Sequence, residues 1–151
     1  MQPRLSPLRV APDAIAAVAA LSKYVESCGL EPELLELVKT RASQINGCAF
    51  CLQMHTRDAR ARGETEERLY LLDAWRESPL YSPRERAALA WTEALTRIAE
   101  THAPDEVYSE AQAQFSEEEL VKLTVAIGVI NTWNRLAIGF RSIHPVASKA
   151  A

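Results

Sequence analysis

One stretch of sequence decides the fold and the chemistry expected of this chain: Glu36-Leu37-Val38-Lys39-Thr40-Arg41-Ala42-Ser43-Gln44-Ile45-Asn46-Gly47-Cys48-Ala49-Phe50-Cys51-Leu52-Gln53-Met54-His55. In its first half, apolar residues recur at the three- and four-residue spacing of a helix face. Asn46-Gly47 is a strong turn signal, and a second helical pattern follows it as far as about Arg62. The stretch therefore predicts two helices joined by a short turn, with two cysteines and a histidine on the second helix.

Helical patterns also fill the rest of the chain. Further helices are expected from the cap Asp13 to Cys28-Gly29, from Thr65 to Trp75, from the capping box at Ser82 to about Thr101, from Pro104 onward, and from the capping box at Ser116 to about Arg141. No segment alternates apolar and polar residues long enough to indicate a strand. The sequence therefore predicts an all-α fold of six or seven helices.

Length and composition limit the domain count and the partners. A chain of 151 residues suits one domain, which we place at residues 12–144, between an extended arm at 1–11 and a tail at 145–151. The net charge of −3 gives no attraction for phosphate backbones, so nucleic acid is not expected as a partner. The longest apolar runs are about eight residues, far short of the ~20 that cross a membrane.

The N-terminal apolar run and the cysteine count bear on location. Ala14–Leu21 follows two arginines, as in a signal peptide, but Asp13 abuts it and its pattern continues into Tyr24 and Val25. We interpret it as the first helix of the fold, with a targeting segment as the alternative. Three cysteines cannot form a complete disulfide framework, and we therefore expect a reducing, cytoplasmic setting.

Cys48, Cys51 and His55 share one face of the predicted helix. Cysteines three residues apart have Cα atoms about 5 Å apart, which is within the range of a disulfide. Unpaired amides at the helix N-terminus favour a thiolate, and an imidazole one turn away can accept the thiol proton. Such a pair can reduce a peroxide, because the first sulfur becomes a sulfenic acid and the second condenses with it.

The position of the histidine favours Cys51 as the attacking thiol. His55 is one turn from Cys51 and two turns from Cys48, and a base must lie within reach of the proton that it takes. Proximity to the helix N-terminus argues instead for Cys48. We expect Cys51 to attack the peroxide and Cys48 to resolve the sulfenic acid. Glu36 lies on the preceding helix, from which it can orient His55.

Other interpretations of these residues stay open. The two cysteines and His55 can be part of a zinc site that takes its fourth ligand from Glu36, His102 or His144. Both cysteines can also be inert core residues, which is the interpretation that we favour for Cys28. Structural zinc sites usually carry a second cluster of ligands, and this sequence has none, so we expect no bound metal.

Polar residues also interrupt the apolar pattern of the last helix. Asn131, Asn134 and Arg135 either line a pocket or form a structural network at a helix crossing. We favour the structural network. The two remaining histidines, His102 and His144, stand alone in the sequence, and we expect them at the surface.

The motif resembles that of the AhpD-like alkylhydroperoxidases in the carboxymuconolactone decarboxylase superfamily. In that motif a Glu is followed by eleven residues and then by Cys-x-x-Cys-x-x-x-His, and the spacing from Glu36 through Cys48 and Cys51 to His55 matches it. The similarity extends from about Leu30 to Arg141. One departure is Phe50, which stands where well-known members have a second histidine and which cannot carry a proton.

The resemblance implies an all-helical enzyme with an antioxidant role. Cys51 would be the peroxidatic cysteine, Cys48 the resolving cysteine, and Glu36 and His55 the proton relay. It also implies a hydroperoxide substrate, no cofactor, an external dithiol reductant such as a lipoylated protein, and a homo-oligomer that is a trimer or hexamer. Two rival functions stay open: a decarboxylase-like proton-transfer enzyme that uses His55 and Glu36, and a non-enzymatic module that senses redox state or holds zinc.

Overall fold

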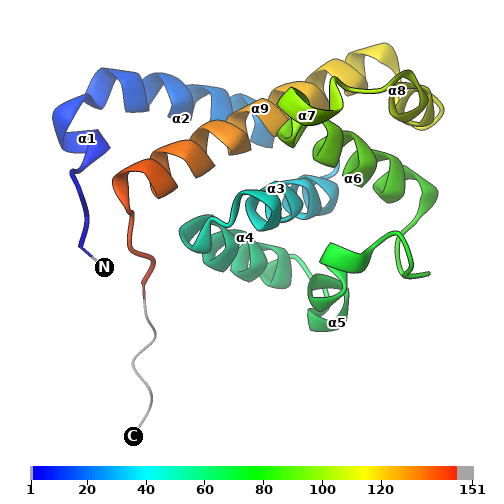
Figure 1. Cartoon of the computed structure of the whole chain (residues 1–151), viewed down its shortest axis with the longest axis horizontal. Coiled ribbons are helices and arrows are strands. Elements are labelled where there is room, and N and C mark those ends of the chain that lie inside the picture. Colours follow the sequence, from blue (N-terminus) through cyan, green and yellow to red (C-terminus); the bar gives the residue numbers. More distant parts are fainter. Residues whose placement is uncertain (1, 146–151) are drawn as a thin grey trace, which may run out of the picture.

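A computed structural model describes residues 2–145 of the chain. Within this range the fold contains helices only, arranged as in Figure 1. They are α1 (Pro7–Val10), α2 (Pro12–Glu26), α3 (Pro32–Asn46), α4 (Ala49–Ala61), α5 (Glu66–Tyr70), the 3-10 turn η1 (Leu72–Ala74), α6 (Pro83–Thr96), α7 (Ile98–Thr101), α8 (Asp105–Gln112) and α9 (Glu117–Phe140). The all-α prediction is therefore confirmed.

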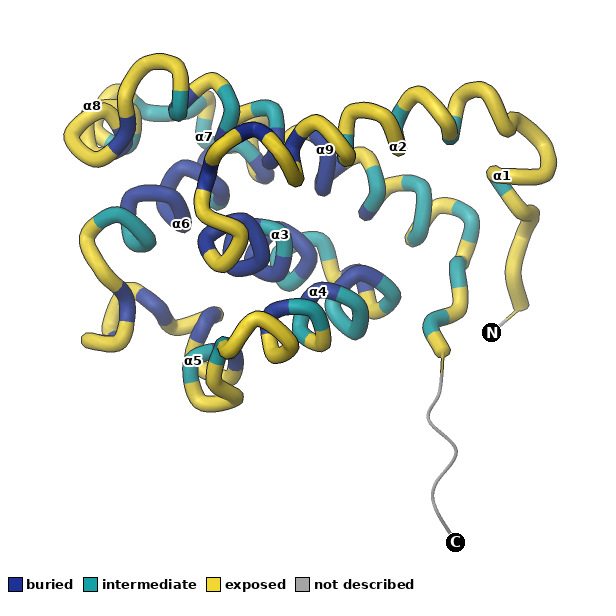
Figure 2. The backbone as a smooth tube through the Cα atoms, turned by 180° about the vertical axis from the view of Figure 1, so that it is seen from behind, coloured by how far each residue is buried: buried dark blue, intermediate teal, exposed yellow. Residues whose placement is uncertain are grey.

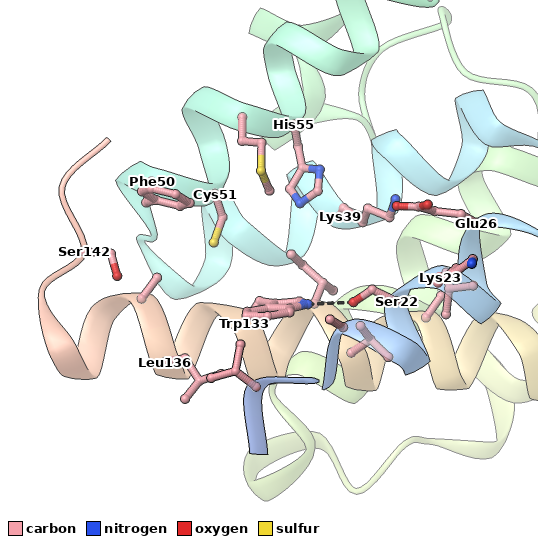
Figure 3. A pocket seen from close by; sticks show the side chains of 18 of the residues that line it. Ser22, Lys23, Glu26, Lys39, Phe50, Cys51, His55, Trp133, Leu136 and Ser142 are labelled. Carbon is pink, nitrogen blue, oxygen red and sulfur yellow. Dashed lines mark hydrogen bonds between the residues drawn. The ribbon is translucent and has the colours of Figure 1, made fainter. Parts of the chain in front are cut away.

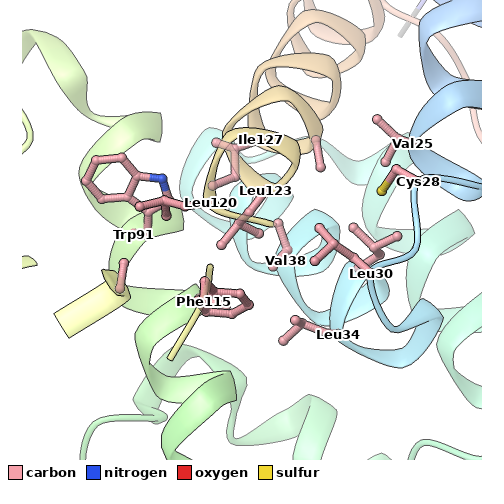
Figure 4. Packing of buried hydrophobic residues seen from close by; sticks show 14 of the residues in the cluster. Val25, Cys28, Leu30, Leu34, Val38, Trp91, Phe115, Leu120, Leu123 and Ile127 are labelled. Atoms are coloured by element: carbon pink, nitrogen blue, oxygen red, sulfur yellow. The ribbon is translucent and has the colours of Figure 1, made fainter. Parts of the chain in front are cut away.

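Helix α3 is the central element of the fold. It contacts α4, α6 and α9, and its middle is buried on every side, whereas α2 is mostly exposed (Figure 2). The main core fills the space between α3, α6 and α9, where Val38 and Leu34 meet Leu123 and Ile127 (Figure 4). Because α3 is held from several sides, the residues at its C-terminal end have fixed positions relative to α4 and α9.

Both capping boxes that the sequence predicted are present. Ser82 caps α6 with Glu85 as its reciprocal partner, and Ser116 caps α9 with Glu119 in the same way. Each arrangement satisfies two backbone amides that the first helical turn would leave unpaired. The start of α9, which carries the polar residues Asn131 and Asn134 further along, is therefore fixed by its own sequence.

Several expected boundaries differ from the structure. The described residues form nine α-helices rather than six or seven, because the helix expected to reach Thr101 breaks at Arg97, whose ψ of 34° is not helical. The segment from Thr65 to Trp75 likewise divides into α5 and η1. Each break ends the repeating hydrogen bonds without changing the apolar spacing, which is why the sequence pattern continues across it.

The N-terminal arm also differs from its expected form. Residues 1–11 were expected to be extended, but Pro7–Val10 form one helical turn, since the fixed φ of Pro7 suits the first position of a helix. Asp13 is not the cap of α2: the helix begins one residue earlier, at Pro12, without a side-chain cap. The expected C-terminal tail at 145–151 lies outside the described residues, except for Pro145.

The N-terminal segment packs against the end of the chain. The Arg4 amide donates to the carbonyl of Phe140 at 3.0 Å, and its guanidinium donates to the carbonyl of Gly139 at 2.9 Å. Further along α2, Ser22 accepts a hydrogen bond of 2.7 Å from the indole of Trp133 on α9. Helix α2 thus runs beside α9 as part of the fold. No helix among residues 2–145 has the length and apolar character needed to cross a membrane.

A buried ion-pair network attaches α3 to α6. The guanidinium of Arg41 donates to Glu93 at 2.9 Å and also contacts Asp73, while the indole of Trp75 donates to the same Glu93 oxygen at 2.8 Å. The second oxygen of Glu93 accepts from Arg76 at 2.8 Å. The Arg41 side chain is only 6% exposed, so its charge depends on these partners.

Replacement of Arg41 tests whether this network stabilises the fold. We expect Arg41→Met to lower the free energy of unfolding by about 3 kcal/mol, because Glu93 stays buried with one cationic partner fewer. Arg57→Met is the matched control: Arg57 is 63% exposed and pairs only with Asp58, so its loss should cost less than about 0.5 kcal/mol. Urea denaturation of both variants measures the difference, and equal effects would contradict the assignment.

Candidate active site

The turn between α3 and α4 determines where the motif cysteines lie. Helix α3 ends at Asn46, and Gly47 follows with a φ of 69°, a left-handed conformation that glycine adopts without a side-chain clash. The amide of Cys48 then donates to the carbonyl of Ser43 at 3.0 Å, which closes the last turn of α3. Cys48 becomes the N-cap residue of α4, next to backbone amides that lack helical partners.

The two motif cysteines face each other across the first turn of α4. Their Sγ atoms lie 2.7 Å apart, and the backbone amide of Cys51 donates to Sγ of Cys48 at 3.4 Å. Both thiols are free and both side chains are buried. Because a disulfide bond measures about 2.05 Å, only a small movement of the sulfurs would close one.

The two thiols differ in their affinity for a proton. The hydrogen bond with Cys51 lowers the pKa of the Cys48 thiol to about 7; burial opposes this effect, and the Cys51 amide and the Asn134 side chain add to it. The same sulfur–sulfur hydrogen bond, together with burial and the charge on Cys48, raises the pKa of Cys51 above its ordinary value. Near pH 7 the reduced pair therefore begins to carry one negative charge and one shared proton.

Glu36 of α3 and His55 of α4 form a buried pair. Nδ1 of His55 lies 2.9 Å from Oε2 of Glu36, and since a carboxylate can only accept, Nδ1 is the protonated nitrogen. Nζ of Lys39 donates to the other oxygen, Oε1, at 3.0 Å. Burial acts to raise the pKa of Glu36, but the His55 hydrogen bond and the Lys39 charge outweigh it and lower that pKa. Glu36 is thus ionised at neutral pH.

A cavity of about 760 Å³ lies beside this pair, between α2, α4 and α9 (Figure 3). Cys51 and His55 form part of its wall, whereas Cys48 does not. Most of the wall is apolar and includes Leu8, Ile15, Phe50, Met54, Trp133 and Leu136. Charged side chains from α2 and α3 also reach it, namely Lys23, Glu26 and Lys39. Cys51 is therefore the motif sulfur that a molecule in the cavity would meet.

The imidazole and the sulfur pair share this cavity without touching. No hydrogen bond joins His55 to either cysteine in the described part of the chain. The His55 ring nevertheless points into the same space as the Cys51 thiol (Figure 3), and its Nε2 is the nitrogen that Glu36 leaves free. Proton exchange between them would need a small side-chain movement or a bridging water.

The polar residues of α9 hold the end of α3. Nδ2 of Asn46 donates to Oδ1 of Asn131 at 2.9 Å and to Oδ1 of Asn134 at 2.8 Å, and Asn134 in turn donates to Oγ of Ser43 at 3.1 Å. Arg135 donates to the Asn131 carbonyl. None of these residues lines the cavity, so the network is structural, as we favoured, although the Asn134 amide also affects the thiols.

The other candidate ligands lie away from this site. His102 is exposed at the end of α7, and Nδ1 of His144 faces the carbonyl of Pro145. Within residues 2–145, no three His, Cys, Asp or Glu side chains gather closely enough to hold a metal ion. The zinc interpretation therefore finds no set of ligands in this part of the chain. Cys28 is buried in the main core.

Two features of the site were missed by the sequence analysis. Lys39 lies three residues after Glu36, a spacing at which opposite charges on a helix meet, so a signal for this contact was available. The cavity could not be inferred in the same way, since its wall combines residues of α1, α2, α3, α4 and α9. Phe50, noted only as a departure from the expected motif, forms part of that wall.

Comparison with known families and proteins agrees with this geometry. The sequence model of the carboxymuconolactone decarboxylase family matches residues 12–94. The uncharacterized Bacillus subtilis protein YdfG is 44% identical over 138 residues, which cover 91% of this chain and 94% of YdfG. The uncharacterized Escherichia coli protein YnjA is 32% identical over 68% of this chain and 56% of its own length.

Solved structures give the same result. A crystal structure of an Agrobacterium tumefaciens protein of unknown function, proposed to be the antioxidant defence protein AhpD, has a TM-score of 0.94 and 53% identity, with 97% of this chain and 100% of that chain covered. The debrominase Bmp8 has a TM-score of 0.78 at 22% identity, over 89% of this chain and 73% of its own, which shows a shared fold. The chain belongs to the carboxymuconolactone decarboxylase family and is an AhpD-like member of it.

Proposed function

We propose that this protein is a thiol-dependent hydroperoxidase that reduces organic hydroperoxides at its Cys48–Cys51 pair. One observation carries the proposal: two free sulfurs lie 2.7 Å apart, and one of them lines a cavity together with an imidazole held by a buried carboxylate. The nearby sulfur can resolve a sulfenic acid, and the imidazole can accept and return a proton.

In the first step, the Cys51 thiolate attacks the terminal oxygen of the hydroperoxide. The O–O bond breaks, Cys51 is oxidised to a sulfenic acid, and the departing alkoxide takes a proton to become an alcohol. His55 supplies that proton after it has received the thiol proton, and Glu36 stabilises the imidazolium that forms in between. The step needs only the pair, the relay and the substrate.

In the second step, Cys48 attacks the sulfur of the Cys51 sulfenic acid. A disulfide forms, and the hydroxide that leaves is protonated to water. An external dithiol then reduces the disulfide by thiol–disulfide exchange and is itself oxidised. We propose a lipoylated protein as the reductant, a trimer or hexamer of this chain as the working form, and an antioxidant role in the cytoplasm.

The choice of Cys51 as the attacking sulfur follows from access. Cys51 lies on the cavity wall and Cys48 does not, so a substrate in the cavity meets Cys51 first. Before substrate binds, the negative charge of the pair lies on Cys48, whose pKa is about 7. A resting thiolate on Cys48 is compatible with attack by Cys51. Transfer of the shared proton from Cys51 to Cys48 across the 2.7 Å gap moves the negative charge to Cys51 before attack.

The cavity also suggests the size of the substrate. A volume of about 760 Å³ with a largely apolar wall suits an organic hydroperoxide better than hydrogen peroxide. Phe50 contributes to that wall at the position where well-known members of the family have a second histidine, so we assign the imidazole of the relay to His55.

A second candidate is a proton-transfer enzyme that resembles the lactone decarboxylases of the family. The observation that favours it is that His55, held by the buried Glu36 carboxylate, lines the cavity whether or not the sulfurs react. Turnover of a lactone by the double variant Cys48→Ala/Cys51→Ala would support this function, whereas thiols that stay unchanged after hydroperoxide is added would contradict the hydroperoxidase.

Trapping of the sulfenic acid tests which sulfur attacks. In Cys48→Ser, one equivalent of cumene hydroperoxide should leave a sulfenic acid on Cys51, because no second thiol is near enough to remove it. In Cys51→Ser, Cys48 should stay unmodified on the same timescale. Dimedone labelling followed by peptide mass spectrometry identifies the modified residue. Cys28→Ser is the control and should form the Cys48–Cys51 disulfide like the unaltered protein; label on Cys48 in Cys51→Ser would overturn the assignment.

The charge state of the pair gives a second prediction. In Cys28→Ser, thiolate absorbance at 240 nm should rise with pH around a midpoint near 7, because the Cys51 hydrogen bond lowers the pKa of Cys48. In Cys28→Ser/Cys51→Ala that bond is absent, and the midpoint should move up towards the free-cysteine value of about 8.5. An unchanged midpoint, or no absorbance rise below pH 8 in Cys28→Ser, would contradict the activation of the pair.

A further inference from the structure

Lys39 occupies an unusual position for a lysine. It lies on α3 one turn after Glu36, its side chain is only 15% exposed, and its Nζ donates to Oε1 of Glu36 at 3.0 Å. It also forms part of the cavity wall that Cys51 and His55 share. A surface lysine can also pair with a glutamate one turn away, but the partner of Lys39 is a buried carboxylate, and Lys39 itself lines the cavity.

The Glu36 carboxylate lies between two nitrogen donors. Nδ1 of His55 contacts Oε2 at 2.9 Å, and Nζ of Lys39 contacts Oε1. Two other charged residues on the cavity wall, Lys23 and Glu26, come from α2 and form no ion pair with Glu36, while α9 contributes no charged side chain to that wall. Among the described residues, Lys39 is thus the fixed positive charge that shares Glu36 with the imidazole.

We propose that Lys39 is a positioning residue of the relay: by holding Oε1 of Glu36, it keeps the His55 imidazole neutral and its Nε2 directed into the cavity. The inference rests on the proposed function in one respect, namely that His55 must be unprotonated to accept a proton from the cysteine pair. It adds a fifth residue to the four of the motif.

The electrostatic reason is a competition for one carboxylate. A buried carboxylate whose only partner is an imidazole favours the protonated ring, because the ion pair then has no net charge. With Lys39 already paired to Glu36, a proton on His55 would leave a net positive charge in a largely apolar pocket. That charge is disfavoured in a site of low dielectric, so the pairing of Lys39 with Glu36 favours the neutral ring.

The geometric reason concerns the orientation of both side chains. The contact with Lys39 fixes one oxygen of Glu36 and directs the other to Nδ1 of His55. With Nδ1 donating to Oε2, the ring nitrogen able to accept a proton is Nε2, on the side of the cavity. Without Lys39, Glu36 would be free to rotate, and both the tautomer and the direction of the ring would be less well defined.

Titration of His55 by NMR tests the proposal directly. We expect Lys39→Met to raise the pKa of the His55 imidazole by roughly one pH unit, because removal of a nearby cation favours the imidazolium. Lys39→Arg retains the charge and should leave the titration unchanged. Lys23→Met is the matched control, since it removes a cation from the same cavity without removing a partner of Glu36, and its shift should be much smaller.

The measurement does not depend on peroxidase activity. The chain contains three histidines, so the His55 signal is assigned by its loss in His55→Asn, and His102 and His144 act as internal references. Lys39→Gln provides a second neutral variant should Lys39→Met be unstable. The proposal is overturned if the neutral variants titrate like the unaltered protein, or if Lys39→Arg shifts His55 as much as Lys39→Met.

A second readout separates this inference from the proposed function. In hydroperoxide-driven thiol oxidation, the rate should fall as the pH is lowered and His55 becomes protonated. For Lys39→Met this fall should begin at a higher pH than for the unaltered protein, by the same shift as in the His55 titration. If Lys39 only stabilised the fold, its replacement would lower the melting temperature and leave this pH profile unchanged. If the unaltered protein does not react with hydroperoxide, the proposed function fails, and the NMR titration still decides the role of Lys39.

Discussion

The site depends on one backbone feature, the two-residue turn that ends α3 and begins α4. Gly47 takes the left-handed conformation, and Cys48 therefore becomes both the closing residue of α3 and the cap of α4. The sulfur of Cys48 can then face that of Cys51 across a single helical turn. Because Asn46 is hydrogen-bonded to two asparagines of α9, the turn is also fixed to the longest helix of the fold.

Helix α3 carries buried charge on two sides that serve different purposes. On one side, the buried guanidinium of Arg41 pairs with Glu93 and Asp73 and joins α3 to α6. On the other, Glu36 is held by Lys39 and His55 beside the cavity. Buried charges are stable only with partners, so both sets of contacts restrict how α3 can move. The first network joins α3 to α6, and the second holds the carboxylate that we propose as the partner of His55 in the relay.

The sequence predicted the fold class and the grouping of site residues, and it failed where distant segments meet. Glu36 and His55 meet because the short turn after Asn46 packs α4 against α3, and sequence spacing alone could not establish this contact between two helices. The break at Arg97 leaves the helical apolar spacing of its segment unchanged, and the single turn at Pro7–Val10 lies in an arm that was expected to be extended, so neither was predicted. The cavity wall comes from five helices, and no local pattern records which faces of α2 and α9 meet.

The most direct test of the account is a single turnover of the reduced protein with one equivalent of cumene hydroperoxide. Chromatography gives the yield of cumyl alcohol, and peptide mapping gives the yield of the Cys48–Cys51 disulfide. We predict one alcohol and one such disulfide per chain, because two thiols supply the two electrons that the O–O bond requires. Hydroperoxide that remains intact while all three thiols stay free would contradict the account.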